Sequence, residues 1–463
     1  MPHRRSFRSV TALSVAVASA ATLGAGAVGS AQAAVGPDVH RAHVRPLVSP
    51  AGSPDATAQF RCQSRPIDGS LGPRCYSPAQ IQTAYQLAPL QSRGLRGKGR
   101  TIVILDAFQN PYIENDLAQF DAKFGLPTPM FEQIAPLGLT PFDPNDPYMV
   151  AWAEEISIDV QWAHVTAPDA RIVLALAPSD QDVDLFGVAR YVVKHRVGDV
   201  LSQSFGQNEA CFDPAALPVA QDAFAEAARQ GITVLASSGD SGAAQVDCTG
   251  TGAALAASYP ASDPRVTGVG GTTLNAALDG TWLGETAWTE PFFGCNPPAV
   301  ATTDINCSGG GFSTIFRRPS YQRATAGIPA SSRGVPDVAY DAGINAGLLT
   351  NCGICNVESG LPPTDPAFYI FGGTSVGAPQ WAGLVATADQ LAHRDLGLIN
   401  PTLYAISHTI AYRASFHDIT DGNNDVTELG TGYNATNSWD PVTGLGTPKA
   451  TALVPLLALG GSF

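Results

Sequence analysis

The sequence predicts an α/β fold in which helices cover both faces of a mainly parallel sheet. Short, apolar, β-branched runs alternate with longer helical patterns, and strands joined through helices run parallel in one sheet. With 463 residues and 44% hydrophobic content, the chain is expected to form one large domain. The expected strands are 101–105, 171–177, 199–204 and 232–236, and the expected helices are 114–124, 150–164, 182–194 and 214–230.

The amino terminus has the pattern of an export signal that is later removed. Arginines precede an apolar, alanine-rich run, and the small residues Ala31 and Ala33 match a cleavage site. The run is only weakly hydrophobic, which disfavours a membrane span. We therefore expect a signal peptide over 1–33, a short extended leader over 34–69 and a folded domain over 70–463.

The helix expected over 150–164 carries two acidic residues among apolar neighbours. Glu155 and Asp159 are four residues apart, so a helix places them on one face. Neighbours such as Ile156 and Trp162 indicate that the helix is buried. Adjacent buried carboxylates are costly unless they share a proton, so a functional role is the favoured explanation.

A third acidic residue follows the strand expected over 232–236. Asp240 stands in a Gly-Asp-Ser-Gly turn, at the edge where open α/β sheets bind ligands. An aspartate between glycines is more often a turn former than a functional group. The position of Asp240 alone therefore does not indicate a functional role.

Ser375 lies in the sequence Gly-Gly-Thr-Ser-Val-Gly-Ala-Pro, at the start of an expected apolar helix through Trp381. The glycines permit a sharp turn from strand to helix, and free N–H groups at a helix start favour negative charge. This setting is typical of a nucleophilic serine, although a helix-capping serine fits the local sequence equally well.

A nucleophilic serine needs a base, and none of the eight histidines stands in a suitable turn. The subtilisin-like enzymes pair a comparable serine with a His-Gly-Thr-His segment, which this sequence lacks. A Ser/His/Asp arrangement would have to use His164 and Asp106. A histidine at a helix end is ordinarily explained by charge compensation, so this alternative is disfavoured.

The residues Glu155, Asp159, Asp240 and Ser375, in this order and setting, resemble those of the sedolisin family of serine-carboxyl peptidases. The resemblance covers roughly residues 70–460 and implies a subtilisin-like fold in a single large catalytic domain. It extends to the motifs at 259–264, 269–272, 309–313, 336–338 and 443–448.

The resemblance implies a role for each of the four residues. Ser375 is the nucleophile, Glu155 the base, Asp159 the group that orients Glu155, and Asp240 the oxyanion donor. A carboxylate with an ordinary pKa near ~4.3 accepts a proton in acid, and an aspartic acid donates to an oxyanion only while protonated. Both requirements predict an acid pH optimum. A silent peptide-binding homologue is disfavoured because all four residues are present.

By resemblance, further residues support the site and bind the substrate. Asp106 supports the Glu155 and Asp159 pair, although the family often has glutamate here. The segment Ser204, Phe205 and Gly206 matches one that pairs with substrate backbone, and an ordinary strand end is its alternative. We expect polypeptide substrates and serine-type endopeptidase activity, with no side-chain preference readable from the sequence.

The resemblance also implies one structural calcium ion near the carboxy terminus. Hard oxygen ligands from a loop suit calcium. The family usually has glycine where Ser438 stands, but any residue supplies a carbonyl oxygen. The expected ligands are Asp418, Ile419, Thr436, Ser438 and Asp440.

Eight cysteines in an exported chain predict disulfide bonds. Spacing leaves the connectivity open, and zinc at the last pair is disfavoured because no second close ligand pair accompanies it. Neighbouring cysteines are expected to pair: Cys62 with Cys75, Cys211 with Cys248, Cys295 with Cys307, and Cys352 with Cys355.

The formal net charge of −14 argues against a nucleic acid partner. Such a surface suits acid, where carboxylates neutralise, although simple solubility explains it equally well. We expect a secreted, extracellular monomer with no membrane partner. The leader is shorter than the folded propeptide usual in the family, so the sequence does not show how activity is restrained during export.

Overall fold

The structure is a computed structural model that describes residues 40–44, 47–51, 60–67, 74–249, 252–290, 306–425 and 432–460. The expected signal peptide lies outside these residues.

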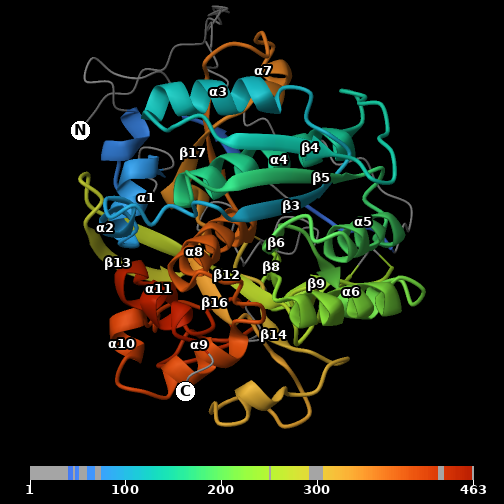
Figure 1. The fold of residues 1–463 in the computed structure, drawn as a ribbon, viewed down its shortest axis with the longest axis vertical. Helices are drawn as coiled ribbons and strands as arrows, with labels where there is room; N and C mark the ends of the chain where they lie inside the picture. The colour runs from blue at the N-terminus through green and yellow to red at the C-terminus, as the bar shows by residue number, and fades with distance from the viewer. Residues whose placement is uncertain are drawn as a thin grey trace, which may run out of the picture. The chain divides into compact units, whose positions relative to one another are not determined.

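A central sheet of eight strands is formed by the described residues (Figure 1). Its order is β13-β12-β8-β6-β3-β5-β4, with β16 also paired to β12. The strands from β12 to β4 are parallel, β16 is parallel to β12, and β13 is antiparallel to it. The bounds are β3 Thr101–Ala107, β4 Met130–Ile134, β5 Arg171–Ala177, β6 Val200–Gln203, β8 Thr233–Ser237, β12 Thr267–Ala276, β13 Trp282–Ala287 and β16 Val338–Asp341.

Helices cover both faces of this sheet, as the sequence predicts. The helices α4 and α8 pack on one face, and α5 and α6 pack on the other. The bounds are α1 Pro78–Ala84, α2 Ala88–Gln91, α3 Ile113–Phe124, α4 Pro147–Thr166, α5 Asp182–Lys194, α6 Leu217–Gln230, α7 Gly353–Glu358, α8 Gly377–Ala392, α9 Asn400–Ser407, α10 Tyr412–Ser415 and α11 Ala450–Ala458.

Alternate side chains of β3 enter two different hydrophobic cores. Ile102 and Ile104 belong to the core under α4 and α8, and Val103 and Leu105 belong to the core under α5 and α6. A strand buried on both faces is a continuous apolar run rather than an alternating one. This explains why the central strands could be recognised in the sequence.

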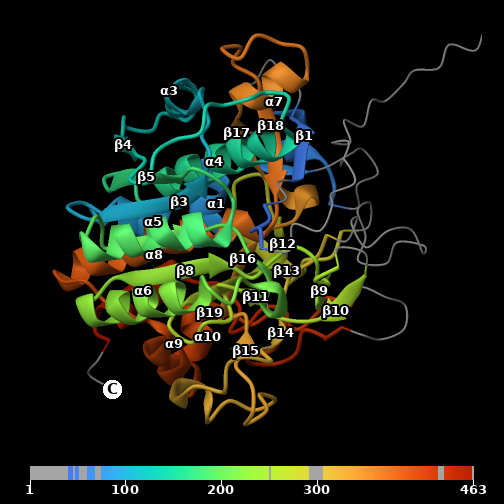
Figure 2. The ribbon, with the colours of Figure 1, turned by 90° about the vertical axis from the view of Figure 1, so that its right-hand side faces the viewer.

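A second sheet carries the segment that precedes Ser375. Its order is β1-β18-β17-β2, with β1 Leu47–Pro50, β2 Cys75–Tyr76, β17 Gly347–Asn351 and β18 Phe368–Gly372. Figure 2 shows β1, β18 and β17 next to one another. Short pairs complete the described strands: β7 Gln207–Asn208 with β11 Ser258–Tyr259, β9 Ala244–Val246 with β10 Ala253–Leu255, β14 Gly311–Phe312 with β15 Gly334–Val335, and β19 Phe416–His417 with β20 Thr447–Pro448.

The helix α4 begins at a well-defined cap and is buried along most of its length. Asp146 Oδ1 accepts a hydrogen bond of 2.9 Å from the N–H of Tyr148, and Pro147 occupies the first helical position. At the far end, Trp162 Nε1 donates a 3.1 Å hydrogen bond to Thr350 Oγ1 in β17. The helix is therefore held at both ends with its acidic residues in the interior.

Small residues let α8 pack closely against the sheet and against α4. A Cβ added to Gly377 would lie 2.8 Å from Val269 Cγ1, and one added to Gly383 would lie 2.6 Å from Thr166 Cβ. Distances this short require the neighbours to move, so only glycine fits at both positions. This close approach brings the start of α8 next to α4.

Three of the expected disulfides are present in the structure. They join Cys62 to Cys75, Cys211 to Cys248, and Cys352 to Cys355. The last bond excludes a zinc site made from these two thiols. Cys307 is also disulfide-bonded, and its expected partner Cys295 lies outside the described residues.

Candidate active site

Ser375 lies in a short 3₁₀ turn, Thr374–Val376, between β18 and α8. The turn starts at Gly373, whose φ of 111° lies in a region that L side chains rarely adopt. A Cβ on Gly373 would also lie 2.8 Å from Asp240 Oδ2. Glycine is thus required here for two reasons, and its backbone conformation sets the direction of the chain at Ser375.

Ser204 connects Ser375 with Asp159. The Ser375 hydroxyl donates a 3.2 Å hydrogen bond to the Ser204 carbonyl oxygen. The Ser204 hydroxyl donates a 2.8 Å hydrogen bond to Asp159 Oδ1. The sequence predicts Ser204 only as part of a substrate-pairing segment, and nothing in its spacing indicates that it would bridge two site residues.

Asp240 contacts the residue that precedes the serine. Asp240 Oδ1 accepts hydrogen bonds from the N–H of Thr374 at 2.8 Å and from its hydroxyl at 2.6 Å. The turn after β8 is therefore tied to the turn after β18. Thr374 is a site residue that sequence reasoning did not identify, although it is part of the Gly-Thr-Ser motif.

Three carboxyl groups lie in the interior below Ser375. The side chains of Asp106, Glu155 and Asp159 are fully buried. Neither oxygen of Asp106 or of Glu155 has a hydrogen-bond partner among the described residues, and one Asp159 oxygen also lacks one. Asp106 thus makes no hydrogen bond to Glu155 or Asp159 in the structure, and its ionised form would raise the pKa of both.

Burial raises the pKa of all three groups. It raises the pKa of Asp106 to about 8. It also raises the pKa of Glu155 well above that of an ordinary glutamate, an effect that the nearby Ser375 hydroxyl opposes and the charges of Asp106 and Asp240 increase. The pKa of Asp159 is raised by burial and by its two neighbours. Three negative charges are not stable together in this space, so the cluster keeps protons.

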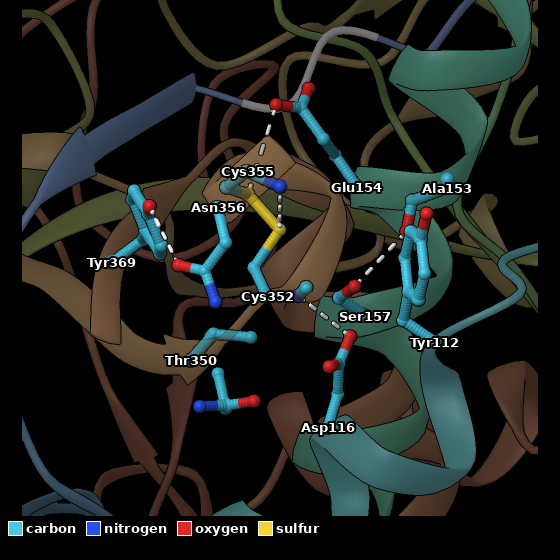
Figure 3. The surroundings of a disulfide bond; sticks show 12 residues. Tyr112, Asp116, Ala153, Glu154, Ser157, Thr350, Cys352, Cys355, Asn356 and Tyr369 are labelled. Carbon is cyan, nitrogen blue, oxygen red and sulfur yellow. Dashed lines mark hydrogen bonds between the residues drawn. A yellow bond between two sulfur atoms is a disulfide. The ribbon is translucent and has the colours of Figure 1, made fainter. Parts of the chain in front are cut away.

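The next residue on α4, Glu154, points to a different neighbour. Figure 3 shows it reaching towards α7, where its Oε1 lies 3.9 Å from Cys355 Sγ. The start of α7 is held by Asp116, which accepts a 2.9 Å hydrogen bond from the N–H of Gly353. Glu154 is half-buried, so adjacent carboxylates on one helix have different surroundings.

His164 does not contribute to the site around Ser375. Its Nε2 lies 2.8 Å from the Pro127 carbonyl oxygen and 3.4 Å from Asp121 Oδ1. Burial lowers its pKa to about 4. The Ser/His/Asp alternative required His164, and that side chain is bound to Pro127 and Asp121 instead.

The remaining two residues of the predicted substrate segment differ in their surroundings. The Phe205 ring is buried and packs against Trp152 and Phe186, with ring centroids 5.7 Å and 6.1 Å away. Gly206 instead forms an antiparallel bridge with His43 of the leader. Phe205 thus anchors the segment, whereas the backbone of Gly206 is paired with the leader.

The residues expected to bind calcium lie close together. The N–H of Ser438 donates a 2.9 Å hydrogen bond to Asp418 Oδ1, and the N–H of Thr436 donates a 3.1 Å hydrogen bond to Asp440 Oδ2. No group of three or more His, Cys, Asp or Glu side chains suited to a metal ion occurs in the described part of the chain. An ion here would therefore need backbone carbonyl oxygens as well as the two carboxylates, and oxygen donors of this kind fit calcium.

The fold and the site define an α/β protein of the serine-carboxyl type. Its serine lies at the start of a helix, next to a group of buried carboxyl side chains. The chain is 33% identical to kumamolisin of Bacillus sp. over 414 residues, and 35% identical to sedolisin of Pseudomonas sp. over 260 residues. It is 31% identical to human tripeptidyl-peptidase 1 over 269 residues. The chain belongs to the sedolisin family. No family model matches it.

A solved structure agrees with this assignment. Pseudomonas sedolisin, described as a serine-carboxyl proteinase complexed with two molecules of pseudo-iodotyrostatin, superimposes with a TM-score of 0.71 at 26% identity. The alignment covers 84% of this chain and 99% of that one. The curated relatives are longer than the part that this chain matches: it covers 66% of kumamolisin, 40% of the sedolisin sequence and 42% of tripeptidyl-peptidase 1.

Buried carboxyl groups predict that the folded chain is more stable in acid than at neutral pH. Besides Asp106, burial raises the pKa of Asp182 to about 7 and that of Asp389 to about 8. A group whose pKa is higher in the folded state binds more protons there than when unfolded. Its contribution to the free energy of unfolding is complete below about pH 4 and is lost as the pH rises towards the folded value.

We expect the melting temperature of Ser375→Ala to fall by at least about 5 °C between pH 4.5 and pH 8. The samples contain a chelator and have the same ionic strength, so that neither bound metal nor salt changes the melting temperature. The Ser375→Ala variant is used because it cannot digest itself. Buried His164 and His417, with pKa values lowered to about 4 and about 3, act in the opposite sense below about pH 6.5. Adding Asp106→Asn should reduce the difference, and a melting temperature that rises with pH over this range would contradict the interpretation.

Proposed function

We propose that this chain is an acid-active serine-carboxyl peptidase. The observation that carries the proposal is that segments far apart in sequence converge on the turn that holds Ser375. Ser204 is hydrogen-bonded to both Ser375 and Asp159, and Asp240 is hydrogen-bonded to the adjacent Thr374. The proposed roles are Ser375 as nucleophile, Glu155 as base, Asp159 as the group that orients the base, and Asp240 as oxyanion donor.

In the proposed reaction, Ser375 Oγ attacks the carbonyl carbon of a peptide bond and its proton passes to Glu155. Asp240 donates a hydrogen bond to the oxygen that gains negative charge. The C–N bond then breaks as Glu155 returns the proton to the leaving amine, which leaves an acyl group on Ser375. Water repeats the sequence at the acyl carbon, releases the acid and restores Ser375.

The surroundings of Glu155 bear on the pH range of this reaction. Glu155 accepts a proton only when ionised, and burial raises its pKa. The low-pH limit of activity is therefore expected above that of a water-exposed glutamate. Water that enters when the site opens would lower the pKa again, because desolvation is its largest cause.

Polypeptides are the proposed substrates, and hydrolysis within the chain is the proposed mode. The relatives bear the names of peptidases, including tripeptidyl-peptidases. A silent peptide-binding homologue would have no need for three buried carboxyl groups under a serine. We also propose secretion, on the basis of the amino-terminal signal pattern, and a monomeric state. No helix in the described residues is long and apolar enough to cross a membrane.

One structural calcium ion is part of the proposal. Asp418 and Asp440, with carbonyl oxygens of Ile419, Thr436 and Ser438, would hold it. Asp440 is buried, and burial raises its pKa to about 6. A bound divalent cation would favour its ionised form, and the ion would tie the carboxy-terminal segments together without taking part in hydrolysis.

Replacement of Glu155 is the sharpest test of the base. Glu155→Gln preserves the shape but removes the proton acceptor, so kcat/KM should fall by at least about 10²-fold. Glu154→Gln, the adjacent carboxylate that faces the Cys352–Cys355 disulfide, is the matched control and should stay within a few-fold of the wild type. The measurement is hydrolysis of an internally quenched peptide from pH 3 to pH 7.

Two further variants complete this test. Ser375→Ala should abolish hydrolysis while its circular dichroism spectrum remains that of the wild type. His164→Ala should lose far less activity than Glu155→Gln. The proposed base would be wrong if His164→Ala were the more damaging of the two, and the proposed nucleophile would be wrong if Ser375→Ala kept its activity.

Calcium should stabilise the fold by binding to the native state only. Excess calcium should raise the melting temperature of Ser375→Ala by several degrees relative to chelated protein, and Asp418→Ala should abolish that increase. Asp365→Ala, at a loop distant in sequence, serves as the control and should preserve it. Equal melting temperatures with calcium and with chelator would contradict the proposed calcium site.

A further inference from the structure

The side chain of Thr374 connects two turns beside Ser375. It is buried, at 1% exposure, between the turn that follows β8 and the turn that holds the serine. The N–H of Gly239 donates a 3.2 Å hydrogen bond to Thr374 Oγ1, and this hydroxyl donates a 2.6 Å hydrogen bond to Asp240 Oδ1. Thr374 therefore accepts from one residue of the β8 turn and donates to the next.

The direction of these hydrogen bonds is fixed by the backbone. A backbone N–H only donates, whereas a hydroxyl both donates and accepts. Because Thr374 Oγ1 accepts from Gly239, its own proton points towards Asp240 Oδ1. The N–H of Thr374 donates to the same oxygen at 2.8 Å. Asp240 Oδ1 thus accepts two hydrogen bonds from one residue.

Both sides of this connection are held in place by their neighbours. The Gly239 carbonyl oxygen accepts a 2.7 Å hydrogen bond from the N–H of Gly309, and the Ser238 hydroxyl donates a 2.6 Å hydrogen bond to the Gly309 carbonyl oxygen. The Thr374 methyl carbon, Cγ2, lies 3.3 Å from the position that a Cβ on Gly271 would occupy. A β-branched side chain has few χ1 rotamers, so this packing fixes the direction of the hydroxyl.

The two carboxyl oxygens of Asp240 therefore have different surroundings. Oδ1 accepts both hydrogen bonds from Thr374, whereas Oδ2 lies on the side of Gly373, 2.8 Å from the position that a Cβ on Gly373 would occupy. In a neutral carboxyl group the carbonyl oxygen is the better acceptor and the other oxygen carries the proton. Two donors at Oδ1 favour it as the carbonyl oxygen, so Oδ2 carries the proton of neutral Asp240.

We propose that Thr374 is a positioning residue that keeps the proton of Asp240 on Oδ2, from which it is donated to the oxygen that gains negative charge when a peptide bond is cleaved. This inference rests on the proposed function, because it takes Asp240 as the oxyanion donor. Without the Thr374 hydroxyl, Oδ1 keeps only the hydrogen bond from the Thr374 N–H. The carboxyl group then exchanges its proton between the two oxygens more easily, and a donor is present at Oδ2 for a smaller part of the time.

The same hydroxyl also affects the upper pH limit of activity. A donor to a carboxylate stabilises the ionised form, so Thr374 lowers the pH at which Asp240 loses its proton. Loss of that proton removes the oxyanion donor. Thr374 therefore places the upper pH limit lower than it would be without the hydroxyl.

One ionisable side chain on a neighbouring helix also faces Asp240. It is Glu155 on α4, whose pKa is raised by the charge of Asp240. The segment 306–309 packs against the Asp240 turn through the N–H of Cys307, which donates a 3.0 Å hydrogen bond to the Asp240 carbonyl oxygen. Cys307 is disulfide-bonded and does not titrate, so this segment adds no charge.

Carbon-13 NMR tests the hydrogen bond without relying on activity. The Asp240 carboxyl signal of full-length Ser375→Ala is assigned by its loss in Asp240→Asn and is titrated with and without Thr374→Val, which keeps the side-chain shape but lacks the hydroxyl. We expect Thr374→Val to raise the midpoint by at least about half a pH unit, and Thr374→Ser to leave it within about 0.2 unit of the parent chain. Thr387→Val is the matched control and should leave the midpoint unchanged, because the buried Thr387 hydroxyl donates to the Gly383 carbonyl oxygen within α8.

Steady-state kinetics test the positioning role in chains that retain Ser375. The substrate is an internally quenched peptide, and kcat and KM are measured from pH 3 to pH 8. Thr374→Val should lower kcat at its optimum by at least about fivefold, which is less than the ~10²-fold or more that loss of an oxyanion donor costs, and should change KM by less than about twofold. Its high-pH limit of kcat should move upward by at least about half a pH unit. Thr374→Ser should restore kcat to within about threefold of the wild type, together with the wild-type pH limit.

The outcomes separate the inference from the function on which it rests. An unchanged Asp240 midpoint in Thr374→Val would overturn the hydrogen bond. A raised midpoint with an unchanged kcat, or a kcat that Thr374→Ser does not restore, would overturn the positioning role of the hydroxyl. A raised midpoint with no hydrolysis by any chain, the wild type included, would overturn the proposed peptidase activity while the hydrogen bond stands. If circular dichroism shows that Thr374→Val does not fold, Thr374→Ala removes the same hydroxyl and replaces it in both measurements.

Discussion

The constraint on which the site depends is the burial of three carboxyl groups in one space that bulk solvent does not reach. Asp106, Glu155 and Asp159 come from β3 and α4, and none has enough hydrogen-bond donors to hold a full negative charge at low cost. The apolar surroundings of α4 are part of this arrangement, because they keep water out. A group that binds a proton strongly in such a space is a stronger base once it is ionised.

The packing of α8 places Ser375 next to the three buried carboxyl groups. Gly377 and Gly383 let α8 approach the sheet and α4 closely, and Gly373 turns the chain so that Ser375 faces inward. Ser204 and Thr374 then join the separate segments by hydrogen bonds, to Asp159 and to Asp240. The positions of the reacting groups thus depend on a few close backbone approaches rather than on long flexible side chains.

Much of the fold and the site could be read from the sequence. Every expected central strand and helix is present, because strands buried on both faces leave continuous apolar runs and helices that cover a sheet leave apolar residues at helical spacing. The edge strand β4 was not predicted, since its residues are mostly exposed, and β12 was not predicted because three glycines interrupt it. The bridging role of Ser204 and the pairing of His43 with Gly206 depend on tertiary contacts that have no period in the sequence. Nor could spacing show that burial raises the pKa of Glu155 above its ordinary value.

Glu155 belongs to a cluster that keeps protons above the ordinary carboxyl range. The most direct measurement is a carbon-13 NMR titration of side-chain carboxyl groups in full-length Ser375→Ala, with the Glu155 signal assigned by its loss in Glu155→Gln. We expect the Glu155 signal to titrate with a midpoint at least about one pH unit above ~4.3, the value of an ordinary glutamate. A midpoint at or below that value, with Asp106 and Asp159 also fully ionised at pH 5, would contradict it.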